Sequence, residues 1–188
     1  RGDRRPVRLI ETHISWVLLG GEAYKIKKPV CLPFLDFTSF DERERACRTE
    51  VRINRRLAPT TYLGVVPIRK HQGKYTFGNG GAITEWAVKM NRLDEELQAD
   101  ALLAGGRLRP EDVDRIADRL AAFHGEAPTN PGVARAGAPE AIERNVLENF
   151  IALHGAEPET VSADVLEEIE RWQVAYLRGR RERFEGRM

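Results

Sequence analysis

The sequence predicts an α+β fold, in which a strand-rich part with one inserted helix is followed by a mainly helical part. Most of the Val, Ile, Thr and Tyr, which favour strands, lie in the first half of the 188 residues. Arg, Glu, Ala and Leu, which favour helices, dominate the second half. The apolar pattern also changes near Leu93 from alternation to helical spacing. We therefore expect two parts, residues 1–92 and residues 93–188.

Five strands are expected in the first part, at 7–10, 16–19, 22–30, 62–69 and 83–90. Gly20 and Gly21 lie between two of these strands, and a glycine pair in that position indicates a tight hairpin. A turn is expected at 72–74 and a flexible loop at 77–81.

One helix interrupts the strands and three helices follow them. Thr38 or Ser39 is a suitable N-cap for the first helix, which should run to about Ala58, before Pro59. The later helices are expected at 109–125, at 142–155 and from 162 onward. A linker rich in Pro, Gly and Ala is expected at 127–138.

The charge balance and the apolar runs argue against several classes of protein. The 30 basic residues nearly match the 29 acidic ones, whereas a nucleic-acid binder usually carries a basic excess. Apolar runs such as Trp16–Leu19 are short, whereas a membrane span needs about 20 residues. We therefore expect neither a nucleic acid nor a membrane as a partner.

Cysteines and tryptophans give further expectations for the core. Cys31 and Cys47 lack the spacing of a metal site or of a CxxC motif, so we expect reduced, buried side chains in a cytoplasmic protein. Trp16, Trp86 and Trp172 are also expected in the core. Trp172 belongs to a stripe at helical spacing that contains Val165, Ile169 and Tyr176.

The strand expected at 22–30 carries two lysines on one face. Alternation places Ala23, Lys25 and Lys27 on that face and turns Tyr24 and Ile26 to the other, which we expect to be the core. An ammonium group is a compact charge suited to phosphate oxygens. The lysine face is therefore a candidate phosphate site.

Glu50 lies on an apolar stripe of the first helix, together with Ala46, Ile53 and Leu57. Burying an unpaired carboxylate is costly, so a cation should meet it, and Lys25 is the best candidate. A Lys–Glu pair that directs the lysine into a cleft can hold nucleotide phosphates. Two plainer interpretations stay open: the two charges only satisfy each other, or both are solvated at the edge of the sheet.

The energetic effect of removing the carboxylate separates these interpretations. Breaking a buried pair costs about 3–5 kcal/mol, whereas a pair facing a wet cleft contributes about 0–1 kcal/mol. For a functional pair in a wet cleft, Glu50→Ala should leave the melting temperature nearly unchanged and weaken the handling of ATP.

Several segments, in order along the chain, resemble the aminoglycoside-phosphotransferase-like kinases, a branch of the protein-kinase-like fold that includes the choline kinases. The resemblance covers roughly residues 7–126, and no segment would be convincing alone. The matching segments are Glu11–Val17, Ala23–Pro29, Glu50–Pro59, Tyr62–Pro67, Trp86–Leu93 and Leu120–His124.

The resemblance implies roles for the strand and the helix. Lys25 resembles the strand lysine of these kinases, and Glu50 its partner on the helix. Ala23, two residues before the lysine, would cover the adenine. Lys27 is a rival for the same role because it shares the face, and the offset from Ala23 favours Lys25.

Two connecting segments acquire roles in the same way. The stretch 12–15 resembles the loop over the phosphates, with Ser15 as a side-chain contact. The stretch 88–92 resembles the hinge whose backbone pairs with adenine, which brings Met90 to the nucleotide.

One part of the family pattern is missing from the sequence. Phosphoryl transfer in this fold needs a catalytic-loop Asp followed by an Asn, and a second Asp that holds a metal ion. The family's loop resembles His-Gly-Asp followed by Asn, and no such motif occurs in the 188 residues. His124 and Gly125 come nearest, but Glu126 follows them and they close an amphipathic helix. We therefore assign no catalytic and no metal-binding residue to this chain.

The resemblance implies the N-terminal part of an ATP-dependent phosphotransferase, which moves a phosphoryl group from Mg-ATP to a hydroxyl of a small molecule. Residues 1–92 would be the nucleotide-binding N-lobe, an antiparallel sheet with one helix, and residues 93–188 the start of an incomplete helical C-lobe. ATP and Mg²⁺ are the implied cofactors, and an additional C-terminal region of the same protein is a possible partner. The alternatives are a non-catalytic nucleotide-binding or protein-interaction module, and a fragment unable to bind nucleotide alone.

Overall fold

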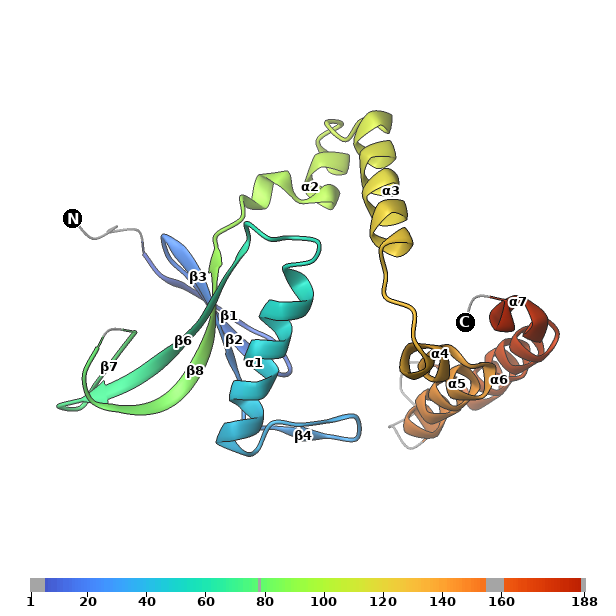
Figure 1. The fold of residues 1–188 in the computed structure, drawn as a ribbon, viewed down its shortest axis with the longest axis horizontal. Helices are drawn as coiled ribbons and strands as arrows, with labels where there is room; N and C mark the ends of the chain where they lie inside the picture. Colours follow the sequence, from blue (N-terminus) through green and yellow to red (C-terminus); the bar gives the residue numbers. More distant parts are fainter. Residues whose placement is uncertain (1–5, 78, 155–160, 187–188) are drawn as a thin grey trace. The chain divides into compact units, whose positions relative to one another are not determined.

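The computed structural model describes residues 6–77, 79–154 and 161–186, and it confirms the α+β class (Figure 1). The chain divides into two compact units, Arg1–Phe123 and His124–Met188. The first unit contains the sheet and the helix packed on it. The boundary expected at residue 92 falls inside this unit, at the end of the last strand.

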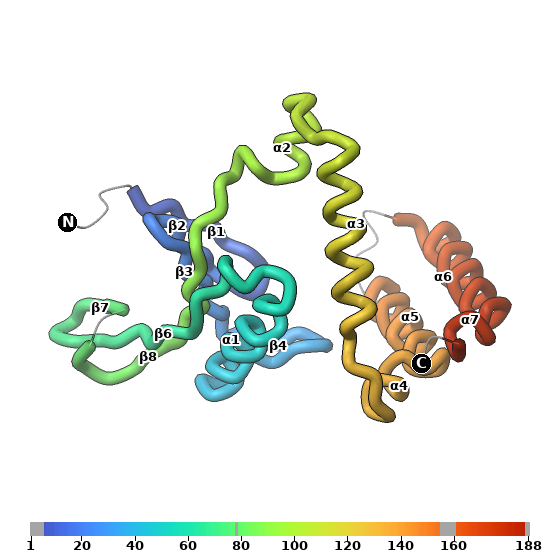
Figure 2. Tube along the Cα trace, turned by 45° about the horizontal axis from the view of Figure 1, so that its top comes forward, coloured from blue at the N-terminus to red at the C-terminus, as the bar shows by residue number. Residues whose placement is uncertain are grey.

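The first unit is built on a six-stranded antiparallel sheet of order β1-β2-β3-β8-β6-β7. Its strands are β1 (Arg8–Glu11), β2 (Ser15–Leu19), β3 (Glu22–Lys27), β6 (Tyr62–His71), β7 (Lys74–Thr76) and β8 (Ala82–Asn91). Figures 1 and 2 show β6 and β8 side by side, with β7 beyond them. The expected turn at 72–74 is confirmed: Gly73 has a φ of 78° and joins β6 to β7.

A short hairpin follows β3 that the sequence did not predict. Strands β4 (Cys31–Leu32) and β5 (Leu35–Asp36) pair as a separate two-stranded sheet. The third strand was expected to continue to Val30, but it ends at Lys27. Cys31 is exposed, contrary to expectation, whereas Cys47 is buried and both thiols are free.

Helix α1 (Phe40–Asn54) lies across one face of the sheet, against β6 and β8 (Figure 1). Ser39, one of the two predicted N-caps, accepts a hydrogen bond from the backbone N–H of Glu42 at 3.1 Å. The helix ends at Asn54 rather than near Ala58.

The buried stripe of α1 differs from the predicted one. Its buried residues are Arg43, Cys47 and Val51, while Ile53 and Leu57 are 49% and 41% exposed. The predicted stripe and the buried stripe are adjacent on the helix surface, since the predicted positions within α1 are next in sequence to buried ones or close to them. Apolar residues therefore occur on both sides of Glu50. Helical spacing alone could not select between them.

The core lies between α1 and the strands β6 and β8. Cys47, Val51 and Val88 form its buried centre. Four partly buried side chains pack around them: Tyr62, Val65, Trp86 and Met90. Removing this apolar surface from water stabilises the packing of α1 on the sheet. This packing positions Glu50 relative to β3.

The strand register decides which face α1 covers. Lys25 lies opposite Val17 on one side and opposite Val88 on the other, and directly paired residues share a face. The lysine face therefore packs toward α1, which corrects the expectation that the opposite face is the core. On that opposite face, Tyr24 stacks on Phe77 at 4.0 Å, and Ile26 lines an open apolar cavity of about 450 Å³.

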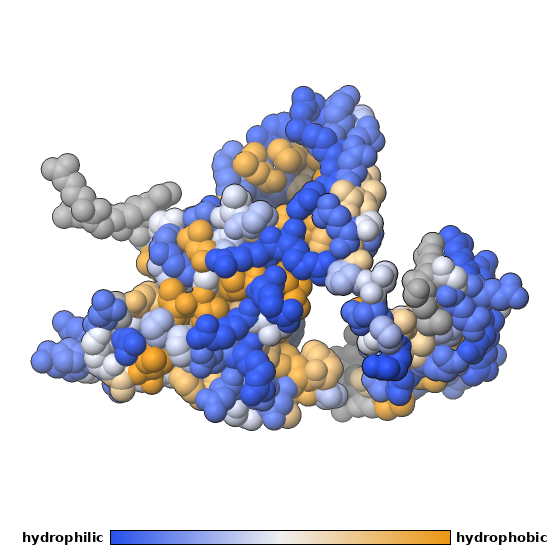
Figure 3. Space-filling view, in the orientation of Figure 1, coloured by the Kyte–Doolittle hydropathy of each residue, from blue (hydrophilic) through white to orange (hydrophobic). Residues whose placement is uncertain are grey.

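Three short or amphipathic helical elements complete the first unit. They are η1 (Glu95–Leu97), α2 (Ala99–Ala104) and α3 (Pro110–Gly125), the last as predicted. Ile116 and Leu120 of α3 are 53% and 42% exposed and line an open groove with Leu102. Figure 3 shows hydrophobic residues over α2 and the sheet, and hydrophilic ones along the outer side of α1.

The second unit consists of helices α4 (Pro131–Gly137), α5 (Pro139–His154), α6 (Ala163–Arg178) and α7 (Arg181–Glu185). The linker expected at 127–138 is wrong, because 131–137 form a helix. Asn130 caps it by accepting hydrogen bonds from the N–H groups of Gly132 and Val133, and Pro131 suits its first turn.

Helix α6 presents a different side to α5 than predicted. Leu166, Val174 and Leu177 are partly buried, whereas Trp172 is 64% exposed and therefore not in the core. The other predicted stripe residues of α6 are also exposed: Val165, Ile169 and Tyr176. The helix has two apolar stripes, and α5 covers the one that the sequence analysis did not select.

Candidate functional site

The site centres on Glu50, whose carboxylate meets two lysines of β3. The ammonium group of Lys25 donates to Oε1 of Glu50 at 2.9 Å. That of Lys27 forms an ion pair with Oε2 of the same carboxylate. The predicted Lys25–Glu50 pair is thus present, and Lys27, predicted as a rival, is a second partner of the same group.

The two lysines are buried to different extents. The side chain of Lys27 is 6% exposed, and its ammonium lies 5.5 Å from the centre of the Phe37 ring. The side chain of Lys25 is 28% exposed, and that of Glu50 is 12% exposed. Two cations and one carboxylate leave one unit of positive charge, and Lys25 is the partner that solvent reaches.

Burial raises the pKa of the Glu50 carboxyl, but the hydrogen bonds donated by Lys27 and Lys25 outweigh burial and hold this pKa below its ordinary value. The carboxylate is therefore ionised at neutral pH. Burial likewise raises the pKa of the neighbouring Cys47 thiol to about 11, so this thiol stays protonated and is a poor nucleophile.

Low exposure of Glu50 and Lys27 changes one energetic expectation. The sequence suggested that Glu50→Ala would hardly alter the melting temperature, as for a pair in a wet cleft. The structure places the Glu50–Lys27 pair in the protein interior, where loss of one partner costs about 3–5 kcal/mol. Only the Lys25 contact has the partial exposure that the earlier expectation assumed.

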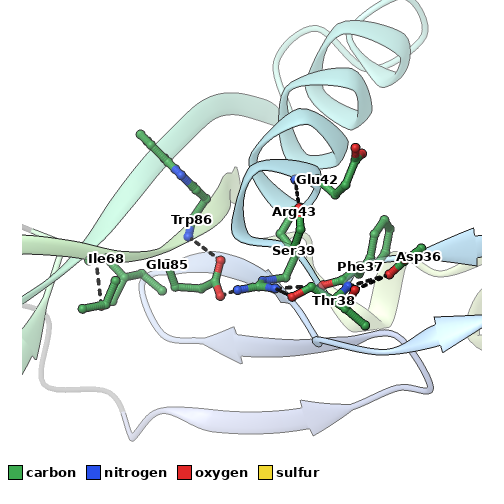
Figure 4. Close-up of polar contacts among 10 residues, drawn as sticks. Asp36, Phe37, Thr38, Ser39, Glu42, Arg43, Ile68, Glu85 and Trp86 are labelled. Carbon is green, nitrogen blue, oxygen red and sulfur yellow. Dashed lines mark hydrogen bonds and ion pairs between the residues drawn. The ribbon is translucent and has the colours of Figure 1, made fainter.

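A second ion pair fixes the beginning of α1 to the sheet, and the sequence analysis missed it. Arg43 donates from Nε to Oε2 of Glu85 on β8 at 2.8 Å, and from Nη1 to the carbonyls of Phe37 and Thr38 (Figure 4). Arg43 is 8% exposed. This contact and the core residues Cys47 and Val51 lock the helix, so that Glu50 faces β3.

One signal for Arg43 was available in the sequence. It precedes Cys47 and Val51 by four and eight residues, which places it on the stripe that is buried. Its partner Glu85 lies 42 residues away, and no local pattern links the two.

Ala23 and Met90 lie on the same face as Lys25. They are opposite each other in the register of β3 and β8. Ala23 is 5% exposed, and Met90 packs on the core that contains Cys47. Both flank the lysine site on the side toward the end of β8.

Ser15, predicted to contact phosphate, lies opposite Lys27 in the register of β2 and β3. It is fully buried, and its Oγ has no hydrogen-bond partner within the described part of the chain. Its backbone N–H donates to Oγ1 of Thr12 at 3.0 Å, which closes the turn between β1 and β2. The structure thus places Ser15 beside the lysines but beneath the surface.

The resemblance implies Mg²⁺ bound together with ATP. In the residues that the structure describes, no three His, Cys, Asp or Glu side chains come together in a way that could hold a metal ion. The cationic site described above is made by lysine side chains. Among residues 6–77, 79–154 and 161–186, no helix is both long and apolar enough to cross a membrane.

Three curated relatives come from two mycobacterial species. They are uncharacterized proteins of Mycobacterium bovis and of two strains of Mycobacterium tuberculosis, each 34% identical to this chain over 179 residues. The match covers 95% of this chain but 34% of each relative, so the chain spans about a third of their length. No family model and no solved structure matches the chain.

Proposed function

We propose that this chain is the nucleotide-binding part of an ATP-dependent phosphotransferase of the aminoglycoside-phosphotransferase-like kind, with a hydroxyl of a small molecule as acceptor. Lys25 binds the nucleotide phosphates, and Ala23 and Met90 lie on the adenine side. The observation that supports this is that two lysines share the carboxylate of Glu50, so the cluster has a net positive charge and Lys25 is its most exposed cation. A phosphate oxygen can accept from an ammonium held in this way.

Titration calorimetry with Mg-ATP tests the proposal. We expect weak binding by the chain, and Lys25→Ala should weaken it at least about tenfold, which corresponds to loss of one charge-assisted hydrogen bond.

Lys89→Ala is the matched control. Lys89 is 30% exposed and pairs with Glu22 at 2.8 Å, but it lies on the opposite face of the sheet, beside Tyr24. Its loss should leave the ATP affinity unchanged. Equal affinities for wild type and Lys25→Ala would contradict the proposal.

Turnover separates the kinase from its alternative. A non-catalytic nucleotide-binding module would share the Lys25 site and differ only in transferring no phosphate. Because the catalytic-loop motif does not occur in the 188 residues, we expect no phosphate transfer by this chain. Measurable transfer would show that another residue set supplies the catalytic carboxylate.

A further inference from the structure

The second lysine of the site, Lys27, is enclosed where Lys25 is accessible. Its side chain is 6% exposed, the Phe37 ring lies beside its ammonium, and the fully buried Ser15 lies opposite it on β2. A phosphate group could not reach this ammonium without displacing those neighbours. The position of Lys27 therefore suits a role toward Glu50 rather than toward a ligand.

We propose that Lys27 is a positioning residue that neutralises Glu50, so that Lys25 keeps its charge for the nucleotide phosphates. This inference rests on the proposed function. With one lysine, the pair would be neutral, and a phosphate would have to take Lys25 from a buried carboxylate left without a partner. With two lysines, Lys25 can transfer its hydrogen bond from Glu50 to a phosphate oxygen, while Lys27 still compensates the carboxylate.

The geometry supports separate roles for the two lysines, Lys27 toward Glu50 and Lys25 toward phosphate. The two lysines use different oxygens of the carboxylate, Lys25 Oε1 and Lys27 Oε2, so each contact can be kept or lost separately. Glu50 itself is held by α1, whose beginning is fixed by Arg43 on Glu85. Lys25 is the most exposed of the three side chains, so a ligand would approach the cluster from its side.

The test measures the Mg-ATP affinity of variants in which Lys27 and Glu50 are neutralised in turn. Lys27→Met should weaken binding at least about tenfold, because Lys25 is then the one remaining lysine partner of the Glu50 carboxylate and cannot leave it without cost. Lys27→Met combined with Glu50→Gln should restore the affinity to within about threefold of wild type, because the site again has one surplus positive charge. Denaturant unfolding of the same variants distinguishes a merely structural role of Lys27, in which the affinity would change only as far as the folded fraction does.

Three outcomes would overturn the inference: a wild-type affinity for Lys27→Met, no recovery in the double variant, or a double variant as weak as Lys25→Ala. The last would make Lys27 itself the phosphate ligand. Circular dichroism would reveal whether Lys27→Met alone fails to fold. In that case, the Mg-ATP affinity of the double variant, compared with the affinities of wild type and Lys25→Ala, still tests the inference. Absence of Lys25-dependent binding in wild type would instead refute the proposed function, and this inference with it. Lys25-dependent binding without rescue refutes the inference alone.

Discussion

Glu50 carries the energetics of the site at the scale of single residues. It is a nearly buried carboxylate whose pKa is held below 4.5 by two lysines, despite the opposing effect of burial. A carboxyl with a depressed pKa in the folded state contributes stability above its unfolded pKa, and that contribution is lost as the pH falls through the folded value. The stability of this chain should therefore depend on Glu50 at neutral pH and less in acid.

Glu50→Gln tests this dependence. At pH 7 it should lower the free energy of unfolding by about 3–5 kcal/mol, because Lys27 remains buried without its counterion. The difference from wild type should narrow as the pH falls below about 4.5, measured by denaturant unfolding at several pH values.

Glu44→Gln is the control on the same helix. Glu44 pairs with the exposed Arg48 at the surface, so its loss should cost about 0–1 kcal/mol. A Glu50→Gln effect as small as this, or one independent of pH, would place the carboxylate in solvent and contradict the buried cluster.

Helix α1 is the element that brings the site together, and its N-terminus depends on one side chain. The Oγ of Ser39 accepts from the N–H of Glu42 and satisfies a backbone donor that the helix leaves unpaired. The adjacent Arg43 contact with Glu85 ties this turn to β8. A weakened cap should therefore lower the stability of the whole first unit.

Ser39→Ala should destabilise the chain by about 1 kcal/mol, and Ser39→Asp should retain most of the stability, because Asp also accepts hydrogen bonds at an N-cap. Denaturant unfolding of the two variants beside wild type measures the difference. An equal loss in both would mean that the cap bond contributes nothing and that another feature of position 39 is responsible.

The elements themselves were largely predictable, because their patterns are local. Ser39 as a cap, the turn at 72–74 and α3 follow from residues adjacent in sequence, and all are confirmed. The face covered by each element was harder to predict. Two apolar stripes compete on α6, and the choice depends on its contact with α5. The hairpin of β4 and β5 has strands of two residues each, too short for an alternation pattern.

The site was predictable only where local sequence patterns determine it. Alternation and helical spacing indicated that Lys25 and Glu50 would meet. These patterns could not predict which of Lys25 and Lys27 is buried, because the burial of Lys27 depends on Phe37 and on the opposing strand. The Arg43–Glu85 contact joins residues far apart in sequence, and only the folded chain reveals it.

At the scale of the whole molecule, the three tryptophans differ in their exposure to solvent. Trp172 is 64% exposed, and Trp16 and Trp86 are partly buried. Trp172→Phe should therefore remove most of the tryptophan fluorescence that iodide quenches, while Trp86→Phe should leave it in place. Unchanged quenching in Trp172→Phe would show that the α6 stripe is covered in solution.

The proposed site occupies one of the two units of a chain that is shorter than its relatives. The chain spans about a third of each mycobacterial relative, and the proposed site lies wholly within the first unit. This chain alone is therefore sufficient to test whether the ammonium of Lys25 is the group that contacts the nucleotide phosphates.

Nuclear magnetic resonance of lysine-labelled protein can detect this contact. The chain has six lysines, so the Cε–Hε signals can be assigned by single Lys→Arg substitutions. We expect Mg-ATP to shift the Lys25 signal most and to leave that of Lys89, on the opposite face, unchanged. An unmoved Lys25 signal, or a larger shift at Lys27 or Lys89, would contradict this expectation.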